Sequence, residues 1–135
     1  MNLGLRMNLD DHDDHDFRTA SLATDQLNGD FREQLVSAML LAIQYWQQAT
    51  FKSKLDLAME SGIWTANQDG STLVTRTLDK YLRLSTLPKR PHTEEVFRTL
   101  HYVLNHCDNH SALREQLESL TDKLIIAHHQ LSLLS

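Results

Sequence analysis

Histidine and cysteine are the residues of this chain that most readily bind a metal ion, and they fall into two groups. Residues 10–16 hold two histidines among five aspartates, and Cys107 lies between His106 and His110, with His101 about one helical turn earlier. Structural zinc sites usually show two close pairs of ligands at set spacing, and neither group has that arrangement. We therefore predict no metal site and no cofactor, and interpret these residues as solvated or core side chains.

Signals for catalysis are weaker still. The sequence has no Gly-rich loop to cradle a phosphate, no serine at a nucleophile elbow, and no Cys–His pair with a third group to orient it. We interpret Cys107 as a small apolar residue that closes a helix, and Trp46 and Trp64 as anchors of a core or an interface. The sequence thus predicts a protein that binds a macromolecule and is not an enzyme.

Charge is distributed unevenly along the 135 residues, whose net charge is −5. Residues 1–50 carry 3 basic and 8 acidic groups, residues 51–106 carry 8 and 6, and residues 107–135 carry 2 and 4. The net charge argues against non-specific binding to nucleic acid. The excess of positive charge in the middle third nevertheless makes that segment a candidate for an anionic partner.

Three features predict a cytoplasmic protein. The single cysteine permits no intramolecular disulfide, which fits a reducing compartment. The N-terminus lacks the apolar core of a signal peptide. The longest apolar run, Ala38–Ile43, is much shorter than the roughly 20 residues that span a bilayer.

The first half of the chain is predicted to consist of an acidic arm and a strong helix. Residues 1–29 are predicted to form the arm, because the run at residues 10–16 is too charged to pack, and this arm is a candidate surface for a protein partner. The helix is predicted to begin at Asp30, with Glu33 completing a capping box. Apolar residues then recur at helical spacing from Leu35 to Trp46 and nearly surround the helix, which favours burial on more than one side.

Residues 51–104 carry the most informative pattern. A short helix capped by Ser53 contains the small residue Ala58, beside which a second helix can cross closely. Gly62 is placed to end that helix in a left-handed conformation, which a side chain would resist. Ile63 would then fill the gap between the two helices.

An amphipathic helix is predicted over Thr72–Leu84, followed by a link with two prolines and a closing helix that Thr93 caps. This order resembles the helix-turn-helix of phage-repressor-like (Cro/repressor-type) transcription regulators, over about residues 44–104. The turn departs from that pattern, because Trp64–Ser71 is about twice as long and contains a tight-turn signal, Asp69-Gly70. The longer turn predicts an exposed excursion, either a small wing or hairpin beside the recognition helix or an angle between helices that is wrong for DNA.

The resemblance implies that the Thr72–Leu84 helix enters the major groove. Arg76, Lys80 and Arg83 lie on its polar face, and Arg and Lys neutralise phosphates while Arg also reads guanine. The predicted base or phosphate contacts are Thr72, Thr75, Arg76, Lys80 and Arg83, with Lys52, Lys54, Lys89 and Arg90 as anchors to the DNA backbone.

The C-terminal segment, residues 108–135, is predicted to be a heptad helix that starts near Ser111. Its apolar residues are spaced 4, 3, 4, 3, 4 and 3 apart: Leu113, Leu117, Leu120, Leu124, Ala127, Leu131 and Leu134. This stripe predicts a homodimer, with dimerisation through Leu113, Leu117, Leu120, Leu124 and Leu131. The same stripe could instead pack on its own domain.

We therefore predict an all-α bundle of about five helices that contains a helix-turn-helix and ends in a dimerisation helix. Its domains are the arm (1–29), the helix-turn-helix-like domain (30–107) and the heptad helix (108–135). The leading function is a sequence-specific DNA-binding transcriptional regulator of bacterial type, acting as a dimer on double-stranded DNA. The alternative is a protein-interaction adaptor or inhibitor with no DNA binding, which would use the acidic arm and the leucine helix.

Overall fold

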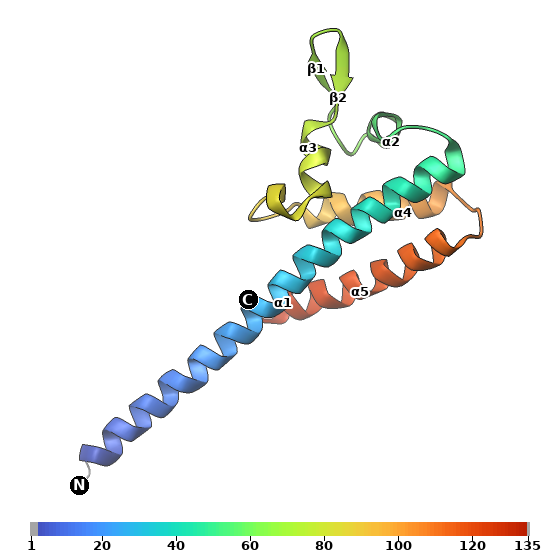
Figure 1. Cartoon of the computed structure of the whole chain (residues 1–135). Coiled ribbons are helices and arrows are strands. Elements are labelled where there is room, and N and C mark those ends of the chain that lie inside the picture. The colour runs from blue at the N-terminus through green and yellow to red at the C-terminus, as the bar shows by residue number, and fades with distance from the viewer. Residues whose placement is uncertain (1–2, 135) are drawn as a thin grey trace.

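The computed structural model describes residues 3–134, with the side chains described from residue 24 onward. Over these residues the fold is all-α, as predicted, with five α-helices and one short antiparallel hairpin (Figure 1). The elements in chain order are α1 (Leu3–Thr50), α2 (Lys54–Ser61), β1 (Asn67–Asp69), β2 (Thr72–Val74), α3 (Arg76–Asp79), the 3-10 helices η1 (Lys80–Leu82) and η2 (Leu84–Thr86), α4 (Thr93–His106) and α5 (Ala112–Leu134).

Helix α1 is the centre of the fold, because α2, α4, α5 and both 3-10 helices pack against it. It is one continuous helix through Asp30, so the predicted helix start at that residue is wrong. Gly29 costs a helix only about 1 kcal/mol relative to alanine, too little to end one that continues into the buried Phe31. The acidic run at residues 10–16 lies outside the part of the chain whose side chains are described.

Helix α2 begins and ends as its sequence predicts. The Ser53 hydroxyl accepts a hydrogen bond from the backbone N–H of Asp56, and the Asp56 carboxylate accepts one from the backbone N–H of Ser53. At the other end Gly62 is left-handed, with φ 69°, and its N–H donates to the carbonyl of Ala58. Leu57 and Ala58 are fully buried, so this short helix is held by packing as well as by its caps.

The segment after α2 differs from the predicted single helix over Thr72–Leu84, which is wrong. Residues 72–74 form β2, which pairs with β1 across a turn at Gly70 (φ 64°), and only Arg76–Asp79 is α-helical before the two 3-10 turns. β-branched residues at positions 72, 74 and 75 favour a strand after a tight turn. The structure has a hairpin here, so the predicted exposure is confirmed for its tip, residues 68–71, and is wrong for Trp64, which is buried.

Helices α4 and α5 complete the core. Thr93 is the first residue of α4 and makes no capping hydrogen bond, so its predicted role as a cap is wrong. Along α5, Leu117 and Leu124 are fully buried within this chain, and the half-buried leucines of the same stripe also pack on the core: Leu113, Leu120 and Leu131. The heptad stripe therefore faces the chain's own domain, principally α1 (Figure 1).

Candidate functional site

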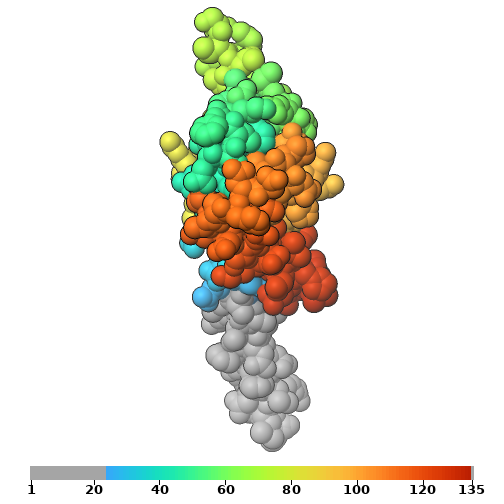
Figure 2. Space-filling view, turned by 90° about the vertical axis from the view of Figure 1, so that its right-hand side faces the viewer, coloured from blue at the N-terminus to red at the C-terminus, as the bar shows by residue number. Residues whose placement is uncertain are grey.

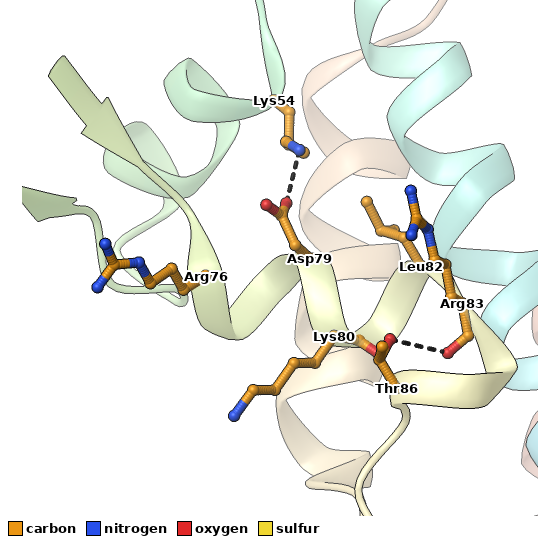
Figure 3. A pocket seen from close by; sticks show the side chains of 7 residues that line it. All are labelled: Lys54, Arg76, Asp79, Lys80, Leu82, Arg83 and Thr86. Atoms are coloured by element: carbon orange, nitrogen blue, oxygen red, sulfur yellow. Dashed lines mark hydrogen bonds and ion pairs between the residues drawn. The ribbon is translucent and has the colours of Figure 1, made fainter. Parts of the chain in front are cut away.

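Four of the predicted basic residues line one hollow of about 350 Å³ beside α3, and their charged ends point in different directions from it (Figure 3). Lys54 comes from the start of α2, Arg76 from α3, Lys80 from η1, and Arg83 from the extended residue between the 3-10 helices. We call this hollow the basic groove, and its full lining is Lys54, Arg76, Asp79, Lys80, Leu82, Arg83 and Thr86. Four of the nine predicted contact residues are thus brought together, although they come from three separate elements and the residue between η1 and η2.

Carboxylates hold two of these four cations. Lys54 Nζ lies 2.5 Å from an Asp79 carboxylate oxygen, and Arg76 lies 3.6 Å from the carboxylate of Asp69 in the hairpin. Among the described residues, Lys80 and Arg83 form no ion pair, and both are exposed. The basic groove therefore contains two tethered cations and two that are open to an anionic partner.

The wall behind the basic groove is buried and held by hydrogen bonds. Leu78 and Tyr81 are fully buried, and the Tyr81 ring lies 4.9 Å from that of Trp64. The Trp64 indole N–H donates to the Thr99 hydroxyl of α4 at 2.7 Å, and the Tyr81 hydroxyl accepts from the backbone N–H of His92 at 2.9 Å. These contacts fix the short α3–η1 segment on α4, which positions the cations in front of it.

The remaining predicted contacts fall outside the basic groove. Thr72 is exposed on the hairpin, whereas Thr75 is 2% exposed and its hydroxyl donates to Asp79 at 3.0 Å. Lys52 is exposed and pairs with Glu60 at 2.9 Å, and the hydrogen bond to that carboxylate raises the pKa of the lysine. Thr75 thus orients the groove carboxylate from behind and is not a surface contact.

The link that carries Lys89 and Arg90 is tied to α1. Both side chains are exposed. The Arg32 guanidinium donates to the carbonyls of Leu87, at 3.2 Å, and Pro88, at 2.7 Å. One long side chain from the central helix therefore fixes the course of this basic link.

Sequence reasoning missed Asp79 as a site residue. It is half exposed, it lines the basic groove, and it accepts hydrogen bonds from both Lys54 and Thr75. Its position four residues after Thr75 is a signal for the contact with the threonine. No comparable signal connects it to Lys54, because that pairing arises only when α2 and α3 pack together.

The described part of the chain contains no metal-binding cluster and no membrane-spanning helix. No three side chains among His, Cys, Asp and Glu come together there in a way that could hold a metal ion. Within the same part of the chain, no helix combines the length and the apolar character needed to cross a membrane.

The comparisons with known proteins give one solved structure. No protein-family model matches this chain, and no curated protein matches it. The crystal structure of the DNA-binding domain from the sensor histidine kinase ChiS of Vibrio cholerae is similar, with a TM-score of 0.76 and 41% sequence identity. The match covers 78% of this chain and 98% of that one.

The fold and the basic groove define a helix-turn-helix-like all-α domain with a hairpin between its two short helices. At this identity and coverage, the chain belongs to the family of the ChiS domain. The resemblance to Cro/repressor-type regulators is supported only at the level of a helix-turn-helix-like fold.

Proposed function

We propose that this protein binds double-stranded DNA through the basic groove. The observation that carries the proposal is that Lys54, Arg76, Lys80 and Arg83 line one hollow in a chain whose net charge is −5. Positive charge gathered on one face of an acidic protein is the electrostatic footprint of a phosphate-binding surface. The description of the ChiS relative as a DNA-binding domain supports the same partner.

The cations of the basic groove take different roles in this proposal. Lys80 and Arg83, which form no ion pair within residues 24–134, neutralise phosphates, and each contact releases counterions from the DNA. Arg76 lies at the start of α3 and beside the hairpin, where its fork of donors can reach a guanine edge. Lys89 and Arg90 anchor the backbone further along, on the link that Arg32 holds.

We further propose that the protein is a sequence-specific transcriptional regulator that acts as a dimer in the cytoplasm. Since the heptad leucines pack within the chain, we assign the contact with a second copy to the outer face of α5. Four exposed apolar side chains lie on that helix: Ile125 (45% exposed), Ile126 (59%), Leu133 (72%) and Leu134 (58%). Two copies would join two half-site contacts into one tighter complex.

The test is selection of binding sites from random duplexes, followed by titration of the selected duplex at several salt concentrations. We expect the wild type to enrich a sequence, and its affinity to fall steeply with salt. The double variant Lys80→Ala/Arg83→Ala should weaken binding to all duplexes and lower the salt slope by about 2, since each lost phosphate contact removes about one released counterion.

Lys123→Ala is the control, because it removes a positive charge from α5 (Ala112–Leu134), and Lys123 does not line the basic groove. It should leave both the affinity and the salt slope unchanged. Absence of salt-dependent binding by the wild type, with no enriched sequence, would overturn the proposal. The adaptor or inhibitor function would then be the better account, and a partner search with the intact acidic arm would follow.

A further inference from the structure

The hairpin between α2 and α3 is the part of the fold that projects furthest from the core near the basic groove. In Figures 1 and 2, two views at right angles, it stands clear of the helices. Its strands pair in a fixed register, Asn67 opposite Val74, Gln68 opposite Leu73, and Asp69 opposite Thr72. A two-stranded ribbon of this kind fits the major groove of B-DNA, which is about 12 Å wide.

The register divides the hairpin side chains into two faces. Opposite residues of an antiparallel pair point to the same side, so Gln68 and Leu73 share one face, and both are exposed. Asn67 and Val74 share the other face and are half-buried against the domain. The hairpin therefore presents one amide and one apolar side chain, Leu73 at 41% exposed, outward as a pair.

Leu73, one residue of this pair, lies next to the basic groove. A second hollow of about 180 Å³ is lined by Leu73, Val74 and Thr75 together with Lys54 and Asp79. Lys54 and Asp79 also line the basic groove, so the two hollows share a wall. If the phosphates of a duplex lie against the cations of the basic groove, the major groove of that duplex would lie beside the hairpin.

The hairpin and the basic groove differ in charge. Residues 67–74 contain no lysine or arginine, and the one acidic residue, Asp69, is paired with Arg76. The hairpin has no cation to attract phosphates, whereas the basic groove has four. What the hairpin offers is hydrogen bonding and apolar contact, the interactions that distinguish one base pair from another.

We propose that the hairpin is the base-reading element, inserted in the major groove, with the Gln68 amide bound to an adenine and Leu73 against a thymine methyl group. This inference rests on the DNA binding proposed above. One N–H of Gln68 donates to the carbonyl of Gly70 at 2.8 Å, which holds the side chain over the turn. The amide has a second N–H and a carbonyl oxygen, the groups with which glutamine binds the N7 and N6 of adenine.

The test uses the duplex that the full-length wild type selects, with a random duplex as the reference. Preference is the affinity for the selected duplex divided by that for the random duplex. In Gln68→Ala/Leu73→Ala this ratio should fall by about 5- to 150-fold for each good base contact removed. Its salt slope and its affinity for the random duplex should stay those of the wild type. Gln44→Ala/Leu40→Ala, the same two changes at exposed positions of α1, should alter neither quantity, and circular dichroism checks that both variants are folded.

A second measurement assigns each contact to its base. Replacing adenine by 7-deazaadenine in the selected duplex should weaken the wild type but not Gln68→Ala, and replacing thymine by uracil should weaken the wild type but not Leu73→Ala. If the wild type binds DNA but the hairpin double variant keeps the site preference, or if the wild type shows no preference, the hairpin assignment is wrong while DNA binding stands. If the wild type binds no DNA, both proposals are wrong.

Discussion

The hydroxyl of Tyr45 accepts a hydrogen bond from Nη1 of Arg114 at 3.1 Å, although 69 residues separate the two in the sequence. The same hydroxyl donates to the Asn109 carbonyl at 2.8 Å. The Arg114 guanidinium also donates to the carbonyls of Leu104 and Cys107. This cluster joins α1, the end of α4 and the start of α5, and satisfies carbonyls that the end of α4 leaves without helical partners.

Tyr45→Phe tests that cluster. Tyr45 is fully buried, so loss of its hydroxyl leaves hydrogen-bonding groups of its neighbours without a partner. We expect a loss of about 1–3 kcal/mol in the free energy of unfolding, measured by urea denaturation with an unchanged slope. Tyr102→Phe is the control, since within residues 24–134 the Tyr102 hydroxyl makes no hydrogen bond, and an equal loss in both variants would contradict the prediction.

Thr99→Val tests the wall behind the basic groove. The substitution keeps the shape of the side chain but removes the acceptor of the Trp64 indole N–H, in a place where both residues are buried. An unsatisfied buried donor costs about 1–3 kcal/mol, so the thermal midpoint should fall by several degrees. Thr121→Val is a matched control, because the Thr121 hydroxyl bonds only its own helix carbonyl, and that variant should lose clearly less stability.

Asp69→Asn tests the tether on Arg76. The carboxylate 3.6 Å from the guanidinium competes with DNA for this cation, and its removal also takes away one negative charge near the phosphates. Because both side chains are more than half exposed, we expect a modest gain of about 2- to 5-fold in DNA affinity at low salt, which shrinks as salt rises. Asp122→Asn on α5 should give no gain, and an equal gain there would assign the effect to net charge alone.

Cys107 gives a prediction about pH. The thiol is 2% exposed, and burial raises its pKa, since the thiolate is poorly solvated there. The folded state therefore holds the thiol proton more tightly than the unfolded state. The contribution of Cys107 to the free energy of unfolding is therefore constant below the ordinary thiol pKa. It declines as the pH rises past that pKa, because the unfolded state then loses the proton first.

Two measurements check the Cys107 prediction. Reaction of the native protein with a thiol reagent at pH 8 should be slow and should become fast in urea. The alkaline decline in stability should be shallower in Cys107→Ala. A native thiol that reacts as fast as a small free thiol would contradict the burial on which the prediction rests.

The proposed dimer is tested on the outer face of α5. Ile126→Glu/Leu133→Glu should keep the fold, because both side chains are exposed, and should yield a monomer by light scattering at tens of micromolar. Leu120→Glu/Leu124→Glu should instead unfold the chain, since Leu124 is fully buried and a carboxylate there would lack a partner. A wild type with the mass of one subunit would show that no dimer forms.

The fold class, the ends of the short helix α2 and the turn of the hairpin could be predicted from the sequence. The capping box at Ser53, the left-handed glycine at Gly62 and the turn at Asp69-Gly70 depend on residues close in the chain, so their patterns predict them. The all-α class follows likewise from the periodic apolar positions. The basic residues could be identified as candidates by their type and spacing. Which of them lie side by side in the fold could not be predicted.

The packing of α5, the hairpin and the basic groove depend on contacts between segments that lie far apart in the sequence. The apolar stripe of α5 suits a partner helix from either a second chain or the same chain, and only the packing on α1 shows that Leu117 and Leu124 are used internally. Likewise, the Thr72–Leu84 segment has the periodicity of a helix, but pairing with β1 draws its first residues into a hairpin. The basic groove depends on the same long-range packing, because Lys54 meets Asp79 only where α2 and α3 come together. The two residues are far apart in the sequence, and local propensities do not predict such a contact.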